Sequence, residues 1–295
     1  MAALIRFLVS DVDGTLVTPD KTVTQAARGA VAELRALGAG FALVSSRPPR
    51  GLATVIDALD LTKNAGAGMP IAATFNGGIV FDAAMQPLEQ HTLAAADAPA
   101  ALAVLAEFDI DAWLFTASSW IATRAEGAYV TREQKTLGFA PQIVASFARW
   151  FDEAGGMDNN VADNALGKIV GSSSDFAKLA RCQAAMATRL SPDAKALLSQ
   201  PYYLDVTHTH ANKGEALKSF ARHAGVAIDE VAAIGDMSND LAMLDIAGFS
   251  VAMGNAPDAV KANVDAVTSA NSDEGFAKAV REFILPRLAT REGMK

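Results

Sequence analysis

Short apolar runs alternate with amphipathic stretches near both ends of the chain. The apolar runs are bounded by polar or glycine-containing turns, a pattern typical of strands buried on both faces of a sheet. Such runs cover residues 4–10, 41–44, 71–75, 79–81, 230–234 and 249–253. Stretches with helical spacing of apolar residues cover 24–37, 52–59, 239–247 and 257–262. Because strands and helices alternate along the chain, we predict an α/β fold with a parallel sheet.

The middle of the chain has a different pattern. Residues 98–107 form an alanine-rich helical stretch, and Asp97 just before it is expected to cap the helix. Short strand-like pieces with less regular spacing follow. We therefore predict an inserted α+β domain at residues 84–209. Residues 1–83 and 210–295 are expected to form a doubly wound parallel-sheet core.

Composition and charge argue against one class of protein. A net charge of −8 and a pI near 5.0 argue against a nucleic-acid binder, which would need a basic face. An acidic protein that handles an anionic substrate needs local positive charge, from a metal ion or from placed Lys and Arg side chains.

The single cysteine and the hydropathy pattern bear on location. Cys182 is the only cysteine, so neither an internal disulfide nor a cysteine metal site can form. No apolar run approaches membrane-spanning length, and the N-terminus lacks a signal-peptide pattern. We expect a soluble, cytoplasmic protein with no membrane partner, and the sequence carries no signal for an oligomeric state.

The first candidate site is the segment Asp11–Thr15, which reads Asp-Val-Asp-Gly-Thr and follows the first predicted strand. Ligands bind at the carboxyl ends of parallel strands, and alternate residues of an extended segment project to one side. The carboxylates of Asp11 and Asp13 can therefore face one crevice, where one can act as a nucleophile and the other as an acid/base group. In isolation such a segment is more often a surface turn, or a calcium loop, although the EF-hand pattern is absent and the apolar strand before it weakens the turn interpretation.

The second candidate site is the segment Gly235–Asp240, which also follows a predicted strand. Asp236 and Asp240 are four residues apart and share a face if a helix begins here. Together with Asp11 they could hold Mg²⁺, which favours a few carboxylates with water and phosphate oxygens. The alternative is an ordinary capped helix start.

Two further residues could hold a phosphate group. Ser45 follows the second predicted strand, and Lys213 precedes a predicted helix. A hydroxyl and an ammonium in these places suit phosphate oxygens, although a helix cap and a solvated lysine are the simpler explanations. His208 and His210 have the spacing of some zinc ligands, but we favour a polar strand end there.

The order of these four elements resembles the haloacid dehalogenase (HAD) superfamily. Its signature is D-x-D-G-T, a strand-end Ser or Thr, a Lys and G-D-x-x-N-D. The insertion between Ser45 and Lys213 resembles the cap of the Cof-like subfamily IIB. Further segments similar to that subfamily are Thr74–Gly78, Lys213–Leu217, Val251–Ala256 and Asn271–Gly275. The resemblance implies a Rossmann-like HAD core with an inserted cap.

The resemblance also implies catalytic and metal-binding roles. Asp11 is expected to be the nucleophile, which becomes a phosphoaspartate, and also a ligand of Mg²⁺. Asp13 is expected to be the acid/base group and to bind Mg²⁺ through its backbone carbonyl. Asp236 is expected to be a further magnesium ligand.

Phosphate-binding and supporting roles follow in the same way. Ser45, Lys213 and Asn239 are expected to bind the phosphate, with Asp240, Asn76 and Asn255 in support. One position departs from the family pattern: Ser46 stands where the subfamily has the Gly of T-G-R, so access beside the site could be narrower.

The combined expectation is a magnesium-dependent phosphatase. The resemblance points to a small phosphorylated metabolite, such as a sugar phosphate, as the partner, and to no nucleic acid. Two alternatives stay open: a phosphomutase of the same subfamily, and a non-enzymatic protein that binds a phosphorylated ligand.

Overall fold

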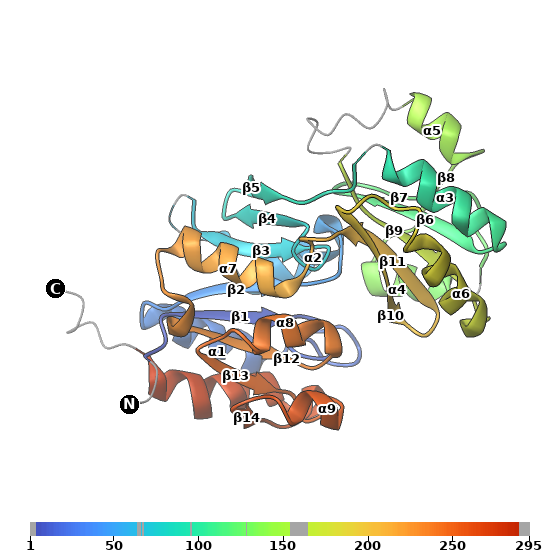
Figure 1. The fold of residues 1–295 in the computed structure, drawn as a ribbon. Coiled ribbons are helices and arrows are strands. Elements are labelled where there is room, and N and C mark those ends of the chain that lie inside the picture. Colours follow the sequence, from blue (N-terminus) through green and yellow to red (C-terminus); the bar gives the residue numbers. More distant parts are fainter. Residues whose placement is uncertain are drawn as a thin grey trace. The chain divides into compact units, whose positions relative to one another are not determined.

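The computed structural model describes residues 4–288 except 64, 65, 67, 95, 128 and 154–164. Its contacts group the chain into two compact units, both drawn in Figure 1. The first unit consists of Met1–Ser46, Ala53–Glu89 and Asn212–Lys295. The second consists of Arg47–Leu52 and Gln90–Ala211, so its long segment begins six residues later than the expected boundary at 84.

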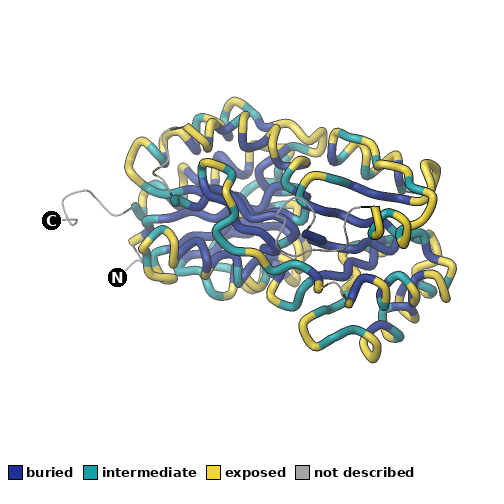
Figure 2. The backbone as a smooth tube through the Cα atoms, turned by 90° about the horizontal axis from the view of Figure 1, so that it is seen from above, coloured by how far each residue is buried: buried dark blue, intermediate teal, exposed yellow. Residues whose placement is uncertain are grey.

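An eight-stranded sheet organises the first unit. Its strand order is β14-β13-β12-β1-β2-β3-β4-β5, and the pairs from β14 to β3 are parallel. The strands are β1 (Phe7–Asp11), β2 (Gly40–Val44), β3 (Pro70–Thr74), β4 (Ile79–Asp82), β5 (Pro87–Gln90), β12 (Val231–Gly235), β13 (Phe249–Ala252) and β14 (Ala266–Val267). The apolar runs thus form strands of a mostly parallel sheet, and β1, β2, β3 and β12 are almost wholly buried (Figure 2).

Helices lie against both faces of this sheet. On one face, α7 packs on β1, β2 and β3, and α8 packs on β12 and β13; on the other, α1 packs on β2 and against α10. The helices are α1 (Gln25–Ala36), α2 (Pro49–Ala58), α7 (Lys213–Ala224), α8 (Leu241–Leu244), α9 (Asp258–Lys261) and α10 (Gly275–Lys278). A π-helical segment, Ala279–Ile284, and 3₁₀ turns at Ile228–Glu230, Ser238–Asp240, Asn271–Asp273 and Leu285–Arg287 complete the unit.

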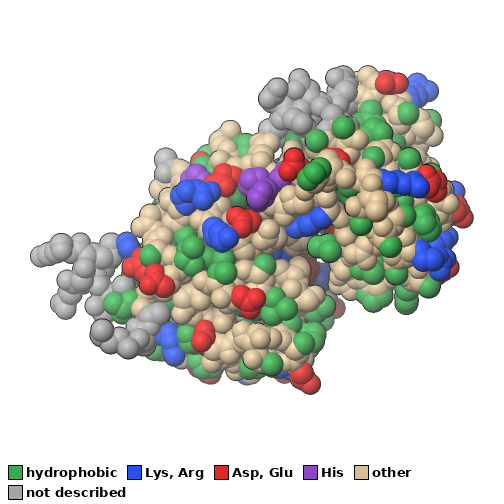
Figure 3. Space-filling model, in the orientation of Figure 1, with side chains coloured by type: hydrophobic (Ala, Val, Ile, Leu, Met, Phe, Trp, Pro, Cys, Tyr) green, Lys and Arg blue, Asp and Glu red, His purple; other side chains and the backbone are tan. Residues whose placement is uncertain are grey.

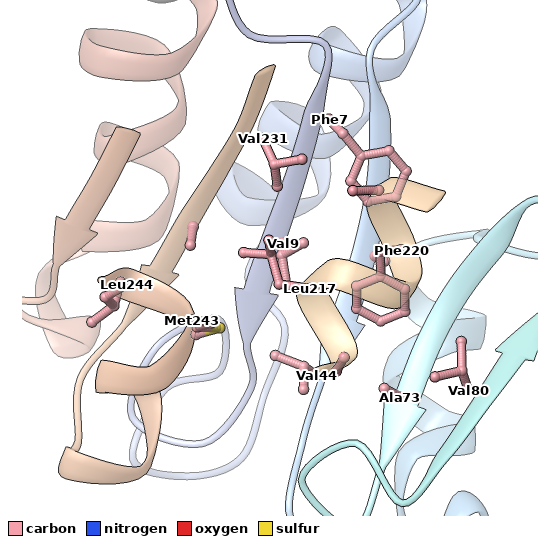
Figure 4. Packing of buried hydrophobic residues seen from close by; sticks show 14 of the residues in the cluster. Phe7, Val9, Val44, Ala73, Val80, Leu217, Phe220, Val231, Met243 and Leu244 are labelled. Atoms are coloured by element: carbon pink, nitrogen blue, oxygen red, sulfur yellow. The ribbon is translucent and has the colours of Figure 1, made fainter. Parts of the chain in front are cut away.

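The core between the sheet and α7 follows from strand alternation. Phe7 and Val9 point to the same side of β1 and pack with Leu217 and Phe220 of α7 (Figure 4). The rings of Phe7 and Phe220 stack with centroids 6.2 Å apart. The next residue on that side of β1 is Asp11, so the packing that buries Phe7 and Val9 also directs Asp11 toward the start of α7.

The second unit has a six-stranded sheet in the order β10-β11-β9-β6-β7-β8. All of its pairs are antiparallel except β7 with β8. The strands are β6 (Asp111–Thr116), β7 (Trp120–Ala122), β8 (Gln142–Ile143), β9 (Leu166–Ser172), β10 (Ala194–Gln200) and β11 (Tyr203–His208). The helices are α3 (Asp97–Glu107), α4 (Val130–Leu137), α5 (Phe147–Glu153) and α6 (Phe176–Met186).

Two helix predictions need correction. Asp97 does not cap α3, because its carboxylate instead accepts hydrogen bonds from the N–H and hydroxyl of Ser191, at 3.0 and 2.9 Å. The helix expected at 239–247 is a 3₁₀ turn followed by the short α8. The chain must return at once to the sheet there, where the Gly248 N–H donates to the carbonyl of Val231.

The two histidines with zinc-like spacing lie at the end of β11. The ring of His208 stacks on those of His210 and His91, and the rings of His91 and His210 are tilted to each other; the centroid distances are 5.4 to 5.5 Å. The Nδ1 of His208 accepts a hydrogen bond from the N–H of His210, which supports the interpretation as a polar strand end. Within the described ranges, every helix is too short or too polar to span a bilayer.

Truncating Phe220 should test the importance of the α7 packing. Phe220 is fully buried against Phe7, so Phe220→Ala is expected to lower the free energy of unfolding by about 3–5 kcal/mol. Urea denaturation followed by circular dichroism measures this. The control is Leu37→Ala, at a residue that is 55% exposed, with an expected change below about 0.5 kcal/mol. Equal losses in the two variants would contradict this account of the core.

Candidate active site

The carboxylate of Asp11 lies buried at the carboxyl end of β1, with 4% of the residue exposed. Neighbouring strands end beside it, since Asp11 is paired with Val44 of β2, and Ser10 with Ile234 of β12. The segments that follow β1, β2 and β12 therefore emerge at one end of the sheet. Parallel strands place ligand sites at that end.

Lys213 is the first residue of α7 and reaches Asp11 from that helix. The side chain of Asn212 caps the helix by accepting from the N–H of Glu215 at 3.0 Å. Gly214 allows close packing, since a Cβ there would lie 2.5 Å from the carbonyl oxygen of Ala242. The buried Nζ of Lys213 lies 2.5 Å from Oδ1 of Asp11 and 2.5 Å from Oδ1 of Asp240.

Asp240 organises the loop after β12. Its Oδ2 accepts the backbone N–H groups of Asp236 and Met237 at 2.8 and 2.9 Å, while its Oδ1 accepts from Lys213. The close approach requires glycine at 235, where a Cβ would lie 2.6 Å from that of Asp240. Both oxygens of Asp240 are thus engaged within the protein, which fits a supporting role.

Asp236 is held by two polar side chains. The hydroxyl of Thr15 donates to its Oδ1 at 3.2 Å, and Nδ2 of Asn255 donates to its Oδ2 at 3.2 Å. The same Nδ2 lies 2.9 Å from the carbonyl oxygen of Gly14. Gly14 has a positive φ of 87°, and a Cβ there would lie 2.2 Å from Oδ2 of Asp236. Only glycine therefore lets the turn after β1 approach this carboxylate.

Hydrogen bonds connect the turn after β3 to the segment after β2. Ser45 is buried, and its carbonyl accepts the N–H of Asn76 at 2.8 Å. The Nδ2 of Asn239 donates to Oδ1 of Asn76 at 3.2 Å. Asn76 has a φ of 61°, which asparagine tolerates better than most residues. Three residues predicted from separate motifs are thus linked in one chain of hydrogen bonds.

Asp13 differs from the other carboxylates in its exposure. Its side chain is 26% exposed, and its Oδ1 lies 2.7 Å from Nζ of Lys21. Access to solvent lets this group exchange protons with water more readily than the buried Asp11. A proton donor and acceptor needs that property.

Burial and crowding of like charges raise the pKa of two of these carboxyl groups. Burial raises the pKa of Asp11; Lys213 opposes this effect, and the charges of Asp240 and Asp236 add to it. Burial, and then the charge of Asp240, raises the pKa of Asp236 to about 6. Burial lowers the pKa of Lys213, but Asp11 and Asp240 outweigh it and hold that pKa above the usual range.

The donor set fits a hard divalent cation. Oxygens from Asp11, Asp236 and Asp240 all lie within 4.8 Å of one another, and all three residues are buried. Three carboxylates and the ammonium of Lys213 leave a net charge of −2 when all are ionised. Mg²⁺ would neutralise that charge, and carboxylate oxygens are the ligands it prefers.

All of the residues predicted for the site lie in the first unit, around the ends of β1, β2, β3, β12 and β13. Three contributors had no predicted role, namely Thr15, Lys21 and Asn271. Asn271 braces Asn255, because its N–H donates to Oδ1 of Asn255 at 2.9 Å. Its side chain also donates to the carbonyl of Val17 at 2.8 Å. Thr15 and Asn271 stood inside matched motifs, whereas Lys21 had no signal in the sequence.

Known proteins resemble this chain over most of its length. A family model described as haloacid dehalogenase-like hydrolase matches residues 8–280, which confirms the family inferred from the motifs. A Haemophilus influenzae protein, classed provisionally as a phosphatase, is 27% identical over 282 residues, or 95% of this chain and 98% of that protein. The pyridoxal phosphate phosphatase YbhA of Escherichia coli is 25% identical over 282 residues, or 95% and 99% of the two chains.

Solved structures share the fold. A haloacid dehalogenase-like hydrolase of Bacteroides thetaiotaomicron superposes with a TM-score of 0.83 at 23% identity, covering 95% of this chain and 100% of that one. The HAD subclass IIB sugar phosphatase BT4131 superposes with a TM-score of 0.74 at 20% identity, covering 94% and 98%. The predicted α/β fold with a parallel sheet is therefore confirmed.

The raised pKa of Asp236 predicts a pH-dependent stability. The folded protein keeps a proton up to about pH 6 that the unfolded chain releases near 3.8, so this carboxyl group stabilises the fold less as pH rises through that window. In metal-free protein, Asp236→Asn should therefore gain stability relative to the parent between pH 4.5 and 7, by on the order of 2 kcal/mol.

Urea denaturation across this pH range, with a chelator present, measures the difference. Asp258→Asn alters an exposed carboxylate and serves as the control, with a difference that stays flat. A flat difference for Asp236→Asn would show that its carboxyl group titrates normally.

Proposed function

We propose that this chain, which belongs to the haloacid dehalogenase-like hydrolase family, hydrolyses phosphate monoesters of small metabolites through a phosphoryl group carried on Asp11. The observation that carries the proposal is the buried carboxylate of Asp11, which lies 2.5 Å from Nζ of Lys213 and beside two further carboxylates. Such a cluster is costly to bury unless a cation and an anionic ligand use it.

In the first step, the oxygen of Asp11 that does not contact Lys213 attacks phosphorus. Lys213 engages Oδ1 of Asp11, which leaves Oδ2 to form the new P–O bond. The bond from phosphorus to the ester oxygen breaks, and Asp13 gives that oxygen its proton. The alcohol then leaves, and Asp11 carries the phosphoryl group.

In the second step, water attacks the phosphoryl group on Asp11. Asp13, now ionised, takes a proton from this water. The bond between phosphorus and Asp11 breaks, which releases inorganic phosphate and restores both carboxyl groups. The ion pair with Lys21 keeps the carboxylate of Asp13 oriented and in contact with solvent.

Two carboxylates and one carbonyl would hold Mg²⁺. These are the side chains of Asp11 and Asp236 and the backbone of Asp13, with Asp240 fixing the loop that carries Asp236. When bound, the ion offsets the repulsion between an anionic nucleophile and an anionic substrate. Thr15 and Asn255 each donate to one oxygen of Asp236 and so hold its carboxylate in place.

The remaining site residues would bind phosphate oxygens. Ser45 and Asn239 offer a hydroxyl and an amide, and Lys213 offers its ammonium. Pyridoxal phosphate and sugar phosphates, which the named relatives hydrolyse, are the first substrates to test. On the face shown in Figure 3, Lys and Arg are interspersed with Asp and Glu, as suits a small ligand better than a nucleic acid.

Replacing the nucleophile should abolish turnover. Asp11→Asn keeps the size of the side chain but cannot form the phosphoryl intermediate, so kcat is expected to fall by at least about 1,000-fold. Release of inorganic phosphate from a panel of phosphorylated metabolites measures this, with circular dichroism as the check on folding. Asp258→Asn should keep parental activity. Parental rates in Asp11→Asn would remove Asp11 from the mechanism, and an isomerised phosphosugar without phosphate release would indicate a mutase instead.

Removal of divalent metal should stop the reaction. Activity is expected to vanish after chelation and dialysis and to return on addition of Mg²⁺. Asp236→Asn should raise the Mg²⁺ concentration for half-maximal activity by about 10- to 100-fold, because it removes one ionised ligand. Asp258→Asn again provides the control. Full activity after exhaustive chelation would contradict a metal requirement.

A further inference from the structure

The turn between β3 and β4 has an unusual backbone conformation. Phe75 and Asn76 are consecutive residues with positive φ angles, of 53° and 61°. The N–H of Gly77 donates to the carbonyl of Thr74 at 2.9 Å, which closes a tight turn with two left-handed central residues. Turns of this kind favour asparagine, aspartate or glycine at both central positions. Asn76 fits that preference, and Phe75 does not.

Phe75 also differs from the other left-handed residues in the described part of the chain. Apart from glycine, the others are Lys21, Asp60, Asn76, Met85, Asp109 and Glu274, all of them at least partly exposed. Phe75 is 0% exposed. A left-handed backbone brings Cβ close to the following carbonyl oxygen and is therefore strained in a bulky residue. Burial of the ring compensates for this strain, so ring and backbone conformation are linked.

The backbone of the turn contacts two segments that carry predicted phosphate ligands. The N–H of Asn76 donates to the carbonyl of Ser45 at 2.8 Å. Gly77 lies against the start of α7, because a Cβ there would be 2.6 Å from the carbonyl oxygen of Asn212. Lys213 follows Asn212 directly. A movement of the turn would therefore disturb the segment after β2 and the start of α7.

The side chain of Asn76 extends these contacts to a third predicted ligand. Its Oδ1 accepts a hydrogen bond from Nδ2 of Asn239 at 3.2 Å. An amide nitrogen carries two hydrogens, and the bond to Asn76 uses one of them. The other can be donated to a phosphate oxygen. The position of Asn76 thus determines how the amide of Asn239 is oriented.

Phenylalanine gives this turn a rigidity that glycine would not. A glycine at position 75 would adopt the same φ without strain, but it would also allow many other conformations. The ring of Phe75 restricts them, because a different backbone conformation would remove the ring from its buried position. The turn is therefore held in one conformation although that conformation is locally unfavourable.

We propose that Phe75 is a positioning residue of the phosphate site. Its buried ring holds the left-handed turn, and the turn holds Asn76 so that Asn239 presents an N–H to the phosphate group. The inference rests on the proposed function, in which Asn239 binds phosphate. This contact is made in the bound substrate as well as in the transition state, so loss of the positioning should raise KM and leave kcat nearly unchanged.

Leucine and isoleucine at position 75 test the role of the backbone conformation. Both keep a buried apolar side chain of one volume, but β-branched residues are far less compatible with a φ of 53°. Phe75→Ile should raise KM for p-nitrophenyl phosphate by about 10- to 100-fold, the loss expected for a hydrogen bond to a charged group. Phe75→Leu should stay within about threefold of the parent. Equal KM values in the two variants would overturn the proposal.

Met85 provides the matched control. It has a φ of 57° in the hairpin between β4 and β5, at the opposite end of β4, where its N–H donates to the carbonyl of Asp82 at 2.9 Å. Met85→Ile and Met85→Leu therefore impose the same contrast on a turn away from the site, and KM should equal that of the parent in both. Circular dichroism checks folding, since a loss of folded protein alone lowers the apparent kcat and leaves KM unchanged.

Phe75→Gly tests the ring separately from the strain. Glycine adopts a φ of 53° freely, so the turn can form but the ring no longer holds it. KM should rise by about 10-fold, and an unchanged KM would show that the ring has no positioning role. This variant also replaces Phe75→Ile if isoleucine prevents folding.

A double-mutant cycle tests whether Phe75 acts through Asn239. Asn239→Ala removes the amide that Asn76 holds and should raise KM by a similar factor. Adding Phe75→Ile to Asn239→Ala should cause no further rise, because the group that the turn positions is then absent. If the two effects multiply instead, Phe75 does not act through Asn239 and the proposal is wrong.

Hydrogen exchange separates this inference from the proposed function. Without any ligand, the backbone N–H of Asn76 should exchange at least about 10-fold faster in Phe75→Ile than in Phe75→Leu or the parent. If Asp11→Asn releases phosphate at the parental rate, the proposed function fails, and the affinity for inorganic phosphate with Mg²⁺ present then replaces KM as the measurement. Unchanged exchange, or faster exchange with undiminished phosphate affinity, would contradict the role of Phe75.

Discussion

The concentration of negative charge at the end of β1 is the constraint on which the first unit depends. Asp11, Asp236 and Asp240 lie within reach of a single ion, and the ammonium of Lys213 contacts two of them with an opposite charge. Repulsion of this kind is tolerated only if the surroundings hold every carboxylate in place. Backbone N–H groups, Thr15 and Asn255 do so. Burial, and after it the charge of Asp240, still raises the pKa of Asp236 in this arrangement.

The order of the strands brings the groups that surround Asp11 together. β1 lies between β2 and β12, so the segments after three adjacent strands meet around one carboxylate. α7 lies across the same strands and begins with Lys213, so a residue on a helix joins residues on loops. The hydrophobic contacts of Phe7 and Phe220 set the position of the helix, and with it the distance from Lys213 to Asp11. Helix α7 thus couples the hydrophobic packing of the core to the ion pair between Lys213 and Asp11.

Much of the first unit could be predicted because the apolar runs that indicate strands are followed directly by the motifs that indicate a site. Apolar runs marked the strands, and the carboxylates follow them directly. The second unit was less predictable, because its informative contacts join residues far apart in sequence. Lys168 and Asp205 form a buried ion pair but carry no motif, and they meet only when β9 and β11 lie side by side. The same limit of sequence-based prediction applies to Asp97. Its carboxylate accepts from Ser191 instead of capping the helix, and that contact exists only in the folded structure.

The discontinuity of the first unit has a consequence for biosynthesis. β1 emerges early from the ribosome, but its partner β12 and the lysine that compensates Asp11 come more than 200 residues later. Until then β1 keeps one unpaired edge, and such edges promote aggregation. The second unit, by contrast, comes mostly from the continuous segment Gln90–Ala211 and can begin to form during translation. The first unit must therefore remain incomplete while the inserted segment folds, so late chain closure should limit the rate at which the folded protein appears.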